Sequence, residues 1–227
     1  MKRSTKVAES NKYGEVRALT VKYRKKTVYC FFKRFFDIVV SSLAIILLSP
    51  LFLIVAILIK RDGGPVFYCQ TRVGKMGKEF KMIKFRSMCV NADSPEMLEK
   101  LRCLNEMDGP VFKMQDDPRI TKIGKFLRKY SIDEIPQLIN VLKNDMTIVG
   151  PRPALPCEAE RYNDRHRQRL LVKQGLTCYW QTQPHRNDIP FEEWINLDLK
   201  YIDRRGALED LKIMFKTFRV VFSGDSI

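Results

Sequence analysis

An apolar run of 25 residues at 35–59 constrains this chain more than any other feature of its sequence. The run carries a single charge, at Asp37, and holds the pair Ser49-Pro50 near its middle. As a straight helix it would reach roughly 38 Å, at about 1.5 Å per residue. The hydrocarbon core of a bilayer is about 30 Å thick. Length alone therefore permits an ordinary transmembrane span.

The flanking charges favour another arrangement. Residues 1–34 hold 11 Lys or Arg and 2 Glu, and Lys60 and Arg61 follow the run, so both flanks favour the cytoplasmic side. A helix that enters the membrane, breaks at Pro50 and returns would satisfy both flanks, because proline removes a backbone donor and clashes with the preceding turn. The alternative is a single spanning helix with a proline kink, which membrane helices tolerate.

Length and charge limit what else the chain can hold. Its 227 residues have room for one membrane element and one further domain, and the sequence has no second long apolar run and no repeat. The net charge of +15 is concentrated before the apolar run. Basic residues beside a membrane attract anionic lipid by about 1 kcal/mol each. We therefore expect residues 1–30 to form a basic arm, which either binds lipid or is a solvated tail.

The cysteines do not form a metal or disulfide pattern. The six cysteines include no CxxC pair, and with two histidines in the chain we predict no zinc site. Free thiols are typical of a reducing compartment. This agrees with a catalytic portion that faces the cytoplasm.

Local patterns predict a mainly helical α+β domain with one small β-hairpin. Residues 65–88 predict two strands around Gly74–Gly77. Helical patterns cover 91–108, 119–130, 192–203 and 207–222. Amphipathic helices with a basic face either lie in a membrane interface or pack into a soluble core, and both readings stay open here.

The strongest chemical signal is the adjacent pair Asp133 and Glu134. Ser131 to Glu134 fits a capping box, in which both end residues satisfy backbone donors at a helix start. Pro136 favours the other interpretation, because proline prefers the first helical position. A helix that begins near Pro136 would leave both carboxylates in the preceding loop with free side chains.

Carboxylates among arginines suit phosphoryl transfer. Arg128 precedes the acidic pair and Arg152 follows it. Arginine forks and a divalent cation neutralise diphosphate oxygens, and an aspartate can attack phosphorus to give an acyl phosphate. Mg²⁺ is the natural metal, because it takes one or two carboxylates together with substrate phosphates.

An ordered series of segments resembles one family. These segments are FKRFFD, the Ser-Pro pair, PVFYCQTRVGKMGKEFKMIKFRSM, DDPRITKIGKFLRKYSIDEIPQLINVLKNDMTIVGPRP and the C-terminal HRNDIPFEEWINLDLKYI. Over roughly residues 31–222 the chain resembles the bacterial sugar transferase family, the monotopic phosphoglycosyl transferases that start exopolysaccharide, O-antigen and other glycoconjugate assembly.

The resemblance implies a reaction and roles for named residues. Asp133 would be the nucleophile that attacks the β-phosphate of a UDP-sugar and expels UMP, after which polyprenyl (undecaprenyl) phosphate takes the phosphosugar in a ping-pong sequence. Asp133 also matches the Mg²⁺-contacting position, and Glu134 is its dyad partner. Arg128 and Arg152 match arginines that hold phosphate. Further matches, assigned to donor binding or local structure, are Gln70, Arg72, Lys84, Arg86, Arg119 and Arg186.

The resemblance also implies an organisation. The family's apolar segment is re-entrant and breaks at the Ser-Pro pair. The predicted parts are a basic arm at 1–30, a membrane hairpin at 31–61 broken at Ser49-Pro50, and a catalytic domain at 62–227 on the cytoplasmic face of the bacterial inner membrane. The expected partners are a UDP-sugar, polyprenyl phosphate and anionic lipid, with a homodimer left open and no nucleic acid.

Some positions depart from the family pattern. KPGITG is replaced by residues 173–178, with Gln174 in place of Pro and Cys178 in place of Gly. Asn144 replaces a usual Gly, a change we expect to cost little because Asn tolerates a left-handed backbone. His185 replaces the Gly of a GRN-like motif. These changes put the identity of the sugar in doubt more than the activity.

Other functional classes fit less well. A basic membrane adaptor or nucleic-acid binder would agree with the pI of 9.6, but no RNA or DNA motif accompanies it. A kinase would need a P-loop or a glycine-rich loop, and the sequence has neither.

Overall fold

The computed structural model describes residues 9–16, 20–102, 114, 117–183 and 189–223. Most of its elements are helices: α1 (Thr27–Lys60), α2 (Pro95–Arg102), α3 (Lys122–Lys129), α4 (Gln137–Leu142), α5 (Pro156–Glu160), α6 (Asp164–Arg167), α7 (Phe191–Arg204) and α8 (Ala207–Ser223). The strands pair two by two: β1 (Glu9–Asn11) with β2 (Gly14–Val16), β3 (Phe67–Val73) with β4 (Glu79–Phe85), and β5 (Thr147–Val149) with β6 (Gly175–Thr177). The predicted mainly helical class with a small hairpin is confirmed.

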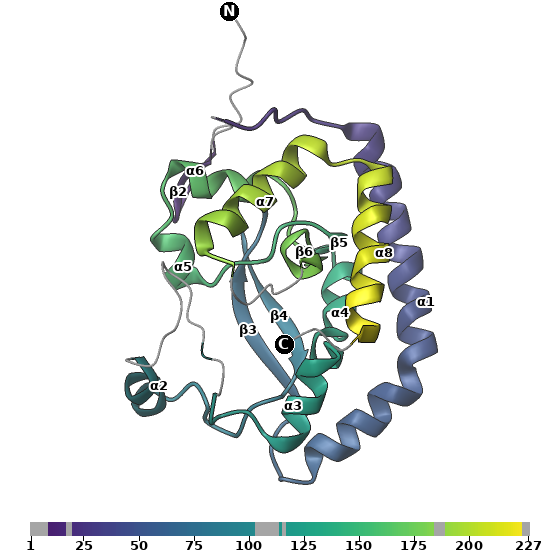
Figure 1. The fold of residues 1–227 in the computed structure, drawn as a ribbon, viewed down its shortest axis with the longest axis vertical. Coiled ribbons are helices and arrows are strands. Elements are labelled where there is room, and N and C mark those ends of the chain that lie inside the picture. Colours follow the sequence, from purple (N-terminus) through teal and green to yellow (C-terminus); the bar gives the residue numbers. More distant parts are fainter. Residues whose placement is uncertain (1–8, 17–19, 103–113, 115–116, 184–188, 224–227) are drawn as a thin grey trace, which may run out of the picture.

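Helix α1 contains the whole apolar run. It remains helical through Ser49 and Pro50, so the expected interruption is wrong in one respect: the helix does not end at the Ser-Pro pair. Proline removes one backbone donor, and a helix can absorb that loss by bending. Figure 1 shows such a bend, because the purple part of α1 runs beside α8 and the blue part turns towards α3. The helix is long and apolar enough to cross a membrane.

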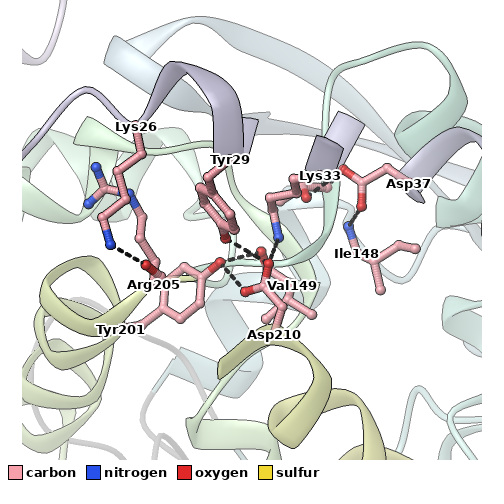
Figure 2. A network of polar contacts seen from close by, with 10 residues as sticks. Lys26, Tyr29, Lys33, Asp37, Ile148, Val149, Tyr201, Arg205 and Asp210 are labelled. Atoms are coloured by element: carbon pink, nitrogen blue, oxygen red, sulfur yellow. Dashed lines mark hydrogen bonds and ion pairs between the residues drawn. The ribbon is translucent and has the colours of Figure 1, made fainter. Parts of the chain in front are cut away.

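The N-terminal half of α1 is bound to several elements of the domain. Tyr29 Oη and Lys33 Nζ each lie 2.6 Å from Asp210 Oδ2 on α8. The Asp37 carboxylate accepts hydrogen bonds from Thr147 Oγ1, at 2.7 Å, and from the backbone amide of Ile148, at 3.1 Å. Figure 2 shows these side chains pointing from α1 into the domain. The single charge of the apolar run therefore has a structural partner.

The C-terminal end of α1 packs against the same domain. Val55 and Ile59 are 3% exposed and form a small apolar cluster with Phe85 of β4 and Leu127 of α3. Between the two attached ends the side chains are open, and Leu43, Ile46, Leu47, Leu53 and Ile54 are 56–79% exposed. Near the N-terminal end of α1, Val28, Phe31 and Phe32 are also 64–71% exposed, so the helix contacts the domain along one side and leaves apolar side chains uncovered on the other.

The predicted hairpin at 65–88 is confirmed as the antiparallel pair β3 and β4. Gln70 lies opposite Met82, and Arg72 lies opposite Phe80. The connection turns at Met76 and Gly77, which have φ values of 55° and 77°. A positive φ is easy for glycine and uncommon for methionine. The hairpin directs Arg72 and Lys84 towards the site described below.

A short parallel pair was not foreseen from the sequence. Strand β5 pairs with β6 through Thr147 with Gly175 and Val149 with Thr177. The backbone at residue 175 lies so close to the backbone at residue 150 that only glycine fits, because a Cβ atom on Gly175 would lie 2.1 Å from the Gly150 nitrogen. Asn144, just before β5, has φ 70°, which confirms the expected left-handed backbone. This pair positions the loops after Val149 and after Thr177 side by side.

The arm before α1 lies on the domain where the structure describes it. Tyr13 and Val21 belong to the main core. The Gln168 side-chain oxygen accepts hydrogen bonds from the backbone amides of Thr20 and Val21, at 2.9 and 3.2 Å. The described segments of the basic arm are therefore packed on the domain and are not a solvated tail, whereas lipid binding by the arm stays a prediction.

The C-terminal helices are confirmed and differ in their surroundings. One face of α7 is buried in the core, including Trp194, Ile195 and Ile202. Helix α8 buries Ile213 but leaves Leu208 and Phe215 more than 70% exposed. Helix α2 confirms the predicted 91–108 helix at 95–102, whereas residues 91–94 form a turn and residues 103–108 lie outside the described residues.

Candidate active site

A polar pocket lies where the β3–β4 hairpin, the start of α4 and the loops after β5 and β6 meet. Its lining residues are Arg72, Met82, Lys84, Glu134, Gln137, Arg152, Pro153, Gly175, Leu176 and Gln181. A larger hollow of about 460 Å³ lies between the arm and α7, but none of the predicted site residues lines it. We place the site in the smaller pocket, because Glu134 lines it together with Arg72, Lys84 and Arg152. Asp133 is not among the lining residues and lies beside Glu134 in the same turn.

The local backbone leaves the Asp133 and Glu134 side chains free of any helix-capping role. Asp133 and Glu134 lie in a single 3-10 turn, η2 (Ile132–Glu134), and α4 begins only after Pro136. Ser131 has φ 53° and its side chain makes no capping hydrogen bond. The capping-box interpretation is therefore wrong, and the helix start near Pro136 is confirmed. Proline cannot donate a backbone hydrogen bond, so the turn ends before the helix proper.

Asp133 is a buried carboxyl group, 6% exposed. Its pKa is raised to about 6, chiefly because the group is buried and also because Glu134 is close, while Lys84 and Arg128 act in the opposite direction. A carboxyl group with so high a pKa is ionised at neutral pH yet poorly solvated. Such a group is a better nucleophile than a hydrated aspartate, and perturbed carboxyl groups concentrate at functional sites.

Glu134 is held between two donors from different elements. Lys84 Nζ on β4 lies 2.7 Å from Glu134 Oε1. Gln181 Nε2 donates to Glu134 Oε2 at 3.2 Å. The Lys84 and Glu134 side chains are 16% and 17% exposed, so the ion pair is largely shielded from water. Both carboxylate oxygens of Glu134 therefore have partners, and its orientation is fixed.

Arg72 and Arg152 give the pocket an excess of positive charge. Arg72 donates to Pro153 O at 3.1 Å and to Gln70 Oε1 at 2.6 Å, while its buried Nε has no partner among the described residues. Burial, together with the nearby Arg152 charge, lowers the pKa of Arg72 to about 10. Arg152 lies over the Trp180 ring at 5.4 Å. An anion in the pocket would relieve the repulsion between the two guanidinium groups.

Arg128 is near the carboxylates but is not among the lining residues. It lies in the last turn of α3, and its charge counteracts the rise in the Asp133 pKa. Its Nε donates to Ser87 Oγ at 2.9 Å. The predicted proximity of Arg128 to Asp133 is therefore borne out by the structure, whereas phosphate binding by Arg128 stays a prediction.

Two other predicted arginines lie elsewhere. Arg86 donates to Pro65 O at 2.7 Å and to Ile59 O at 3.2 Å, and it also pairs with Asp62. Arg119 forms a buried ion pair with Asp117, with a shortest distance of 2.6 Å. Neither lines the pocket, and donor binding by either stays a prediction without geometric support. Arg186 and His185 lie outside the described residues.

The carboxylates fit magnesium better than a metal with many protein ligands. Within the described residues no group of three His, Cys, Asp or Glu side chains could hold a metal ion. Asp133 offers a carboxylate to which no other described side chain donates a hydrogen bond, and Glu134 is its neighbour. Mg²⁺ typically takes one or two carboxylates and completes its shell with water and substrate phosphate. The donor set therefore fits Mg²⁺ bound together with a diphosphate.

Sequence reasoning missed Trp180 and Gln181. Both lie in the 3-10 turn η4 (Trp180–Thr182), directly after the segment that departs from the family pattern. Buried Cys178 donates to Gln181 Oε1 at 3.7 Å, and buried Gln174 donates to Arg169 O at 3.2 Å. The departures therefore lie in the layer that supports the pocket. No spacing rule in the sequence identifies a glutamine that reaches a carboxylate 47 residues away.

Comparison with known proteins agrees with the site. The model of the bacterial sugar transferase family matches residues 28–224, so the chain belongs to that family. It is 43% identical over 192 residues to the galactosyl transferase CpsE of Streptococcus agalactiae, covering 85% of this chain and 42% of that protein. It is 44% identical over 202 residues to the undecaprenyl-phosphate galactose phosphotransferase of Salmonella typhimurium, covering 86% and 41%.

A relative of similar length completes the comparison. The exopolysaccharide production protein ExoY of Sinorhizobium fredii is 42% identical over 192 residues, which cover 83% of this chain and 84% of that protein. This chain therefore spans about 42% of the longer relatives and most of the shorter one. The residues matched by the family model, 28–224, include every residue that lines the pocket.

Proposed function

We propose that this chain transfers a sugar 1-phosphate from a UDP-sugar to polyprenyl phosphate and releases UMP, through a covalent phosphosugar on Asp133. The observation that carries the proposal is one buried carboxylate beside a pocket lined by Lys84, Arg72 and Arg152. The relatives whose names specify galactose or lipid-carrier transfer support this class of reaction. The reaction would be the first membrane step of an exopolysaccharide or a related glycoconjugate.

The first half-reaction forms an acyl phosphate. A carboxylate oxygen of Asp133 attacks the β-phosphorus of the UDP-sugar, the bond from that phosphorus to the bridging oxygen breaks, and UMP leaves with the electron pair. Arg152 and Arg72 offset the charge that develops on the phosphate oxygens. Burial of Asp133 assists, because a poorly solvated carboxylate loses little hydration on attack.

The second half-reaction regenerates the carboxylate. A phosphate oxygen of polyprenyl phosphate attacks the same phosphorus, and the bond to Asp133 breaks. The product is a polyprenyl diphosphate sugar. Lys84 fixes the Glu134 carboxylate beside Asp133. There its negative charge destabilises the phosphosugar bound to Asp133, and the carboxylate also assists in proton or metal handling. When Mg²⁺ is bound by Asp133 and substrate phosphates, it neutralises diphosphate charge.

The arrangement of α1 supports a re-entrant membrane element. Arg34 donates to the carbonyl oxygens of Val141 and Leu142 near one end of α1, and Ile59 packs on Leu127 near the other. A polar domain remains on one side of a bilayer, so a helix with both ends on that domain enters and leaves by the same surface. The chain would lie on the cytoplasmic face of the inner membrane, where a lipid phosphate meets a soluble nucleotide sugar.

The activity is tested with the full chain in detergent. It is incubated with Mg²⁺ and, in turn, UDP-glucose, UDP-galactose and their N-acetylated counterparts, and UMP is measured. Without lipid we expect one UMP per active site, and with undecaprenyl phosphate continuous turnover. Asp133→Asn should abolish both signals. Asp164→Asn, which changes an exposed carboxylate on α6, is the matched control. UMP release by Asp133→Asn equal to that of the control would refute the assignment.

The topology is tested by labelling single cysteines in intact cells with a reagent that does not cross the membrane. A cysteine introduced at Lys33 and one at Arg61 should both be protected from outside and labelled after permeabilisation. Labelling of one end from outside would show that α1 spans the membrane.

A further inference from the structure

The turn η4 joins the two halves of the site. It follows β6, and its neighbouring residues Trp180 and Gln181 reach different functional groups. Gln181 contacts the carboxylate side of the pocket, and Trp180 contacts the arginine side.

Gln181 is oriented by hydrogen bonds at both ends of its amide. Its Nε2 donates to Glu134 Oε2 at 3.2 Å. Its Oε1 accepts from the thiol of Cys178 at 3.7 Å. The two contacts require opposite ends of the amide, so they define which way the group faces. Glu134 cannot turn away from Lys84 without losing the Gln181 donor.

Trp180 supports the phosphate-binding side. The Arg152 guanidinium lies 5.4 Å from the centre of the Trp180 ring. Cation–π contacts of this kind hold a guanidinium in one plane while leaving its N–H groups available at the edges. The backbone of Arg152 is also fixed, because Arg169 Nη2 donates to its carbonyl oxygen at 3.0 Å.

The turn itself is anchored in the core. The Trp180 ring packs on Trp194 of α7, with ring centroids 4.3 Å apart. Thr182 Oγ1 donates to Tyr179 O at 2.8 Å. The Tyr179 hydroxyl donates to Glu209 of α8. A turn attached to both C-terminal helices can serve as a rigid reference for the flexible side chains of the site.

We propose that η4 aligns the catalytic pair with the phosphate-binding arginine, with Gln181 positioning Glu134 and Trp180 positioning Arg152. This inference rests on the proposed function. It assigns two positioning residues with separable effects: Gln181 acts on the chemical step, and Trp180 acts on donor binding.

The first test replaces Gln181 with methionine, which has similar length and no donor. We expect kcat for UMP release to fall about tenfold to a hundredfold, the range for a lost hydrogen bond to a charged group. KM for the UDP-sugar should stay within twofold. The matched control is Gln183→Met, because Gln183 donates to Tyr179 O from the same turn without reaching Glu134. Equal kcat values for the two variants, or matching losses of kcat and Tm, would overturn the role of Gln181.

The second test replaces Trp180 with leucine and, separately, with phenylalanine. Loss of the ring should raise KM about threefold to thirtyfold, in line with a partly buried cation–π contact. Phenylalanine should restore part of the loss, and kcat should change less than in Gln181→Met. Binding of UDP to variants that also carry Asp133→Asn gives a readout independent of turnover. Unchanged UDP affinity in Trp180→Leu that remains folded would overturn the role of Trp180.

The experiments distinguish failure of the proposed function from failure of the proposed alignment by η4. If the wild-type chain releases no UMP with any donor, the proposed function fails. If the wild-type chain and Gln181→Met release UMP equally while Asp133→Asn is inactive, the proposed function stands and the alignment by η4 fails.

Discussion

Arg152 and Arg119 are similar in sequence context and opposite in structure. Each lies in a segment that resembles the family; the resemblance implies phosphate binding for Arg152 and either donor binding or a local structural role for Arg119. Arg152 lines the pocket and lies on the Trp180 ring. Arg119 is 6% exposed and binds Asp117 through both its Nε and its Nη2. One guanidinium faces the pocket, and the other is bound to a carboxylate two residues away.

The difference shows that a guanidinium serves a substrate only where the protein leaves its donors available. The pKa values agree with this division. Asp117 holds the pKa of Arg119 above its usual value, whereas burial and the nearby Arg152 charge lower the pKa of Arg72. Arg72 and Arg152 repel each other in the pocket, whereas Arg119 is paired with Asp117 outside it. We therefore predict that substitution of a pocket arginine reduces activity and that substitution of a paired arginine reduces stability.

Arg152→Met should have the largest effect. Removing one donor that stabilises developing charge typically costs 10²–10³ in rate, about 3–4 kcal/mol. We expect kcat/KM for the UDP-sugar to fall by that factor, with Tm nearly unchanged. Arg161→Met, at an exposed position after α5, is the control. A loss of activity smaller than threefold would remove Arg152 from the site.

Arg119→Met should change stability rather than activity. The variant leaves a buried Asp117 carboxylate unpaired, which costs about 3–5 kcal/mol in the free energy of unfolding. KM should be unchanged at a temperature where the variant is folded. The double variant Arg119→Met/Asp117→Leu should recover most of the stability, because replacing both partners of a buried pair is nearly neutral. A stable double variant with a strongly raised KM would show instead that Arg119 binds the donor.

The sequence predicted local structure better than long-range pairing. Apolar length, the hairpin glycines and Pro136 each act locally, so a helix over the apolar run, the β3–β4 hairpin and the turn before α4 could be foreseen. The parallel pairing of β5 with β6 could not, because it joins two three-residue strands that are 25 residues apart. Asp133 and Arg152 were found for their motif, whereas Gln181 depends on that pairing.

Pro50 shows a second limit of sequence reasoning. A proline predicts a disturbed helix, but the bend it permits depends on what holds the two sides. Here Asp37 binds β5, and Ile59 packs on α3. The helix therefore bends without ending.

Asp133→Asn should stabilise the fold, by less than Arg119→Met destabilises it. Burial raises the folded-state pKa of Asp133 to about 6 from the ordinary 3.8. Between these pH values the folded state binds more protons than the unfolded state, so stability falls as pH rises. Above pH 6 the ionised carboxylate destabilises the fold by about 1–3 kcal/mol. The neutral amide removes this cost, so the inactive variant should be more stable than the wild type at pH 7.5.

The measurement is chemical unfolding of both chains in detergent with EDTA, because a bound cation would stabilise the carboxylate. The advantage of Asp133→Asn should shrink as pH falls through 6 and vanish below about 3.8, where Asp133 is protonated in both states. Asp164→Asn, which changes an exposed carboxylate, should give no comparable gain. A variant less stable than the wild type at pH 7.5 would mean that the pocket stabilises the Asp133 charge. In that case the charges around the pocket would stabilise the fold as well, and the contrast between arginines that stabilise the fold and arginines available to substrate would be wrong for the pocket.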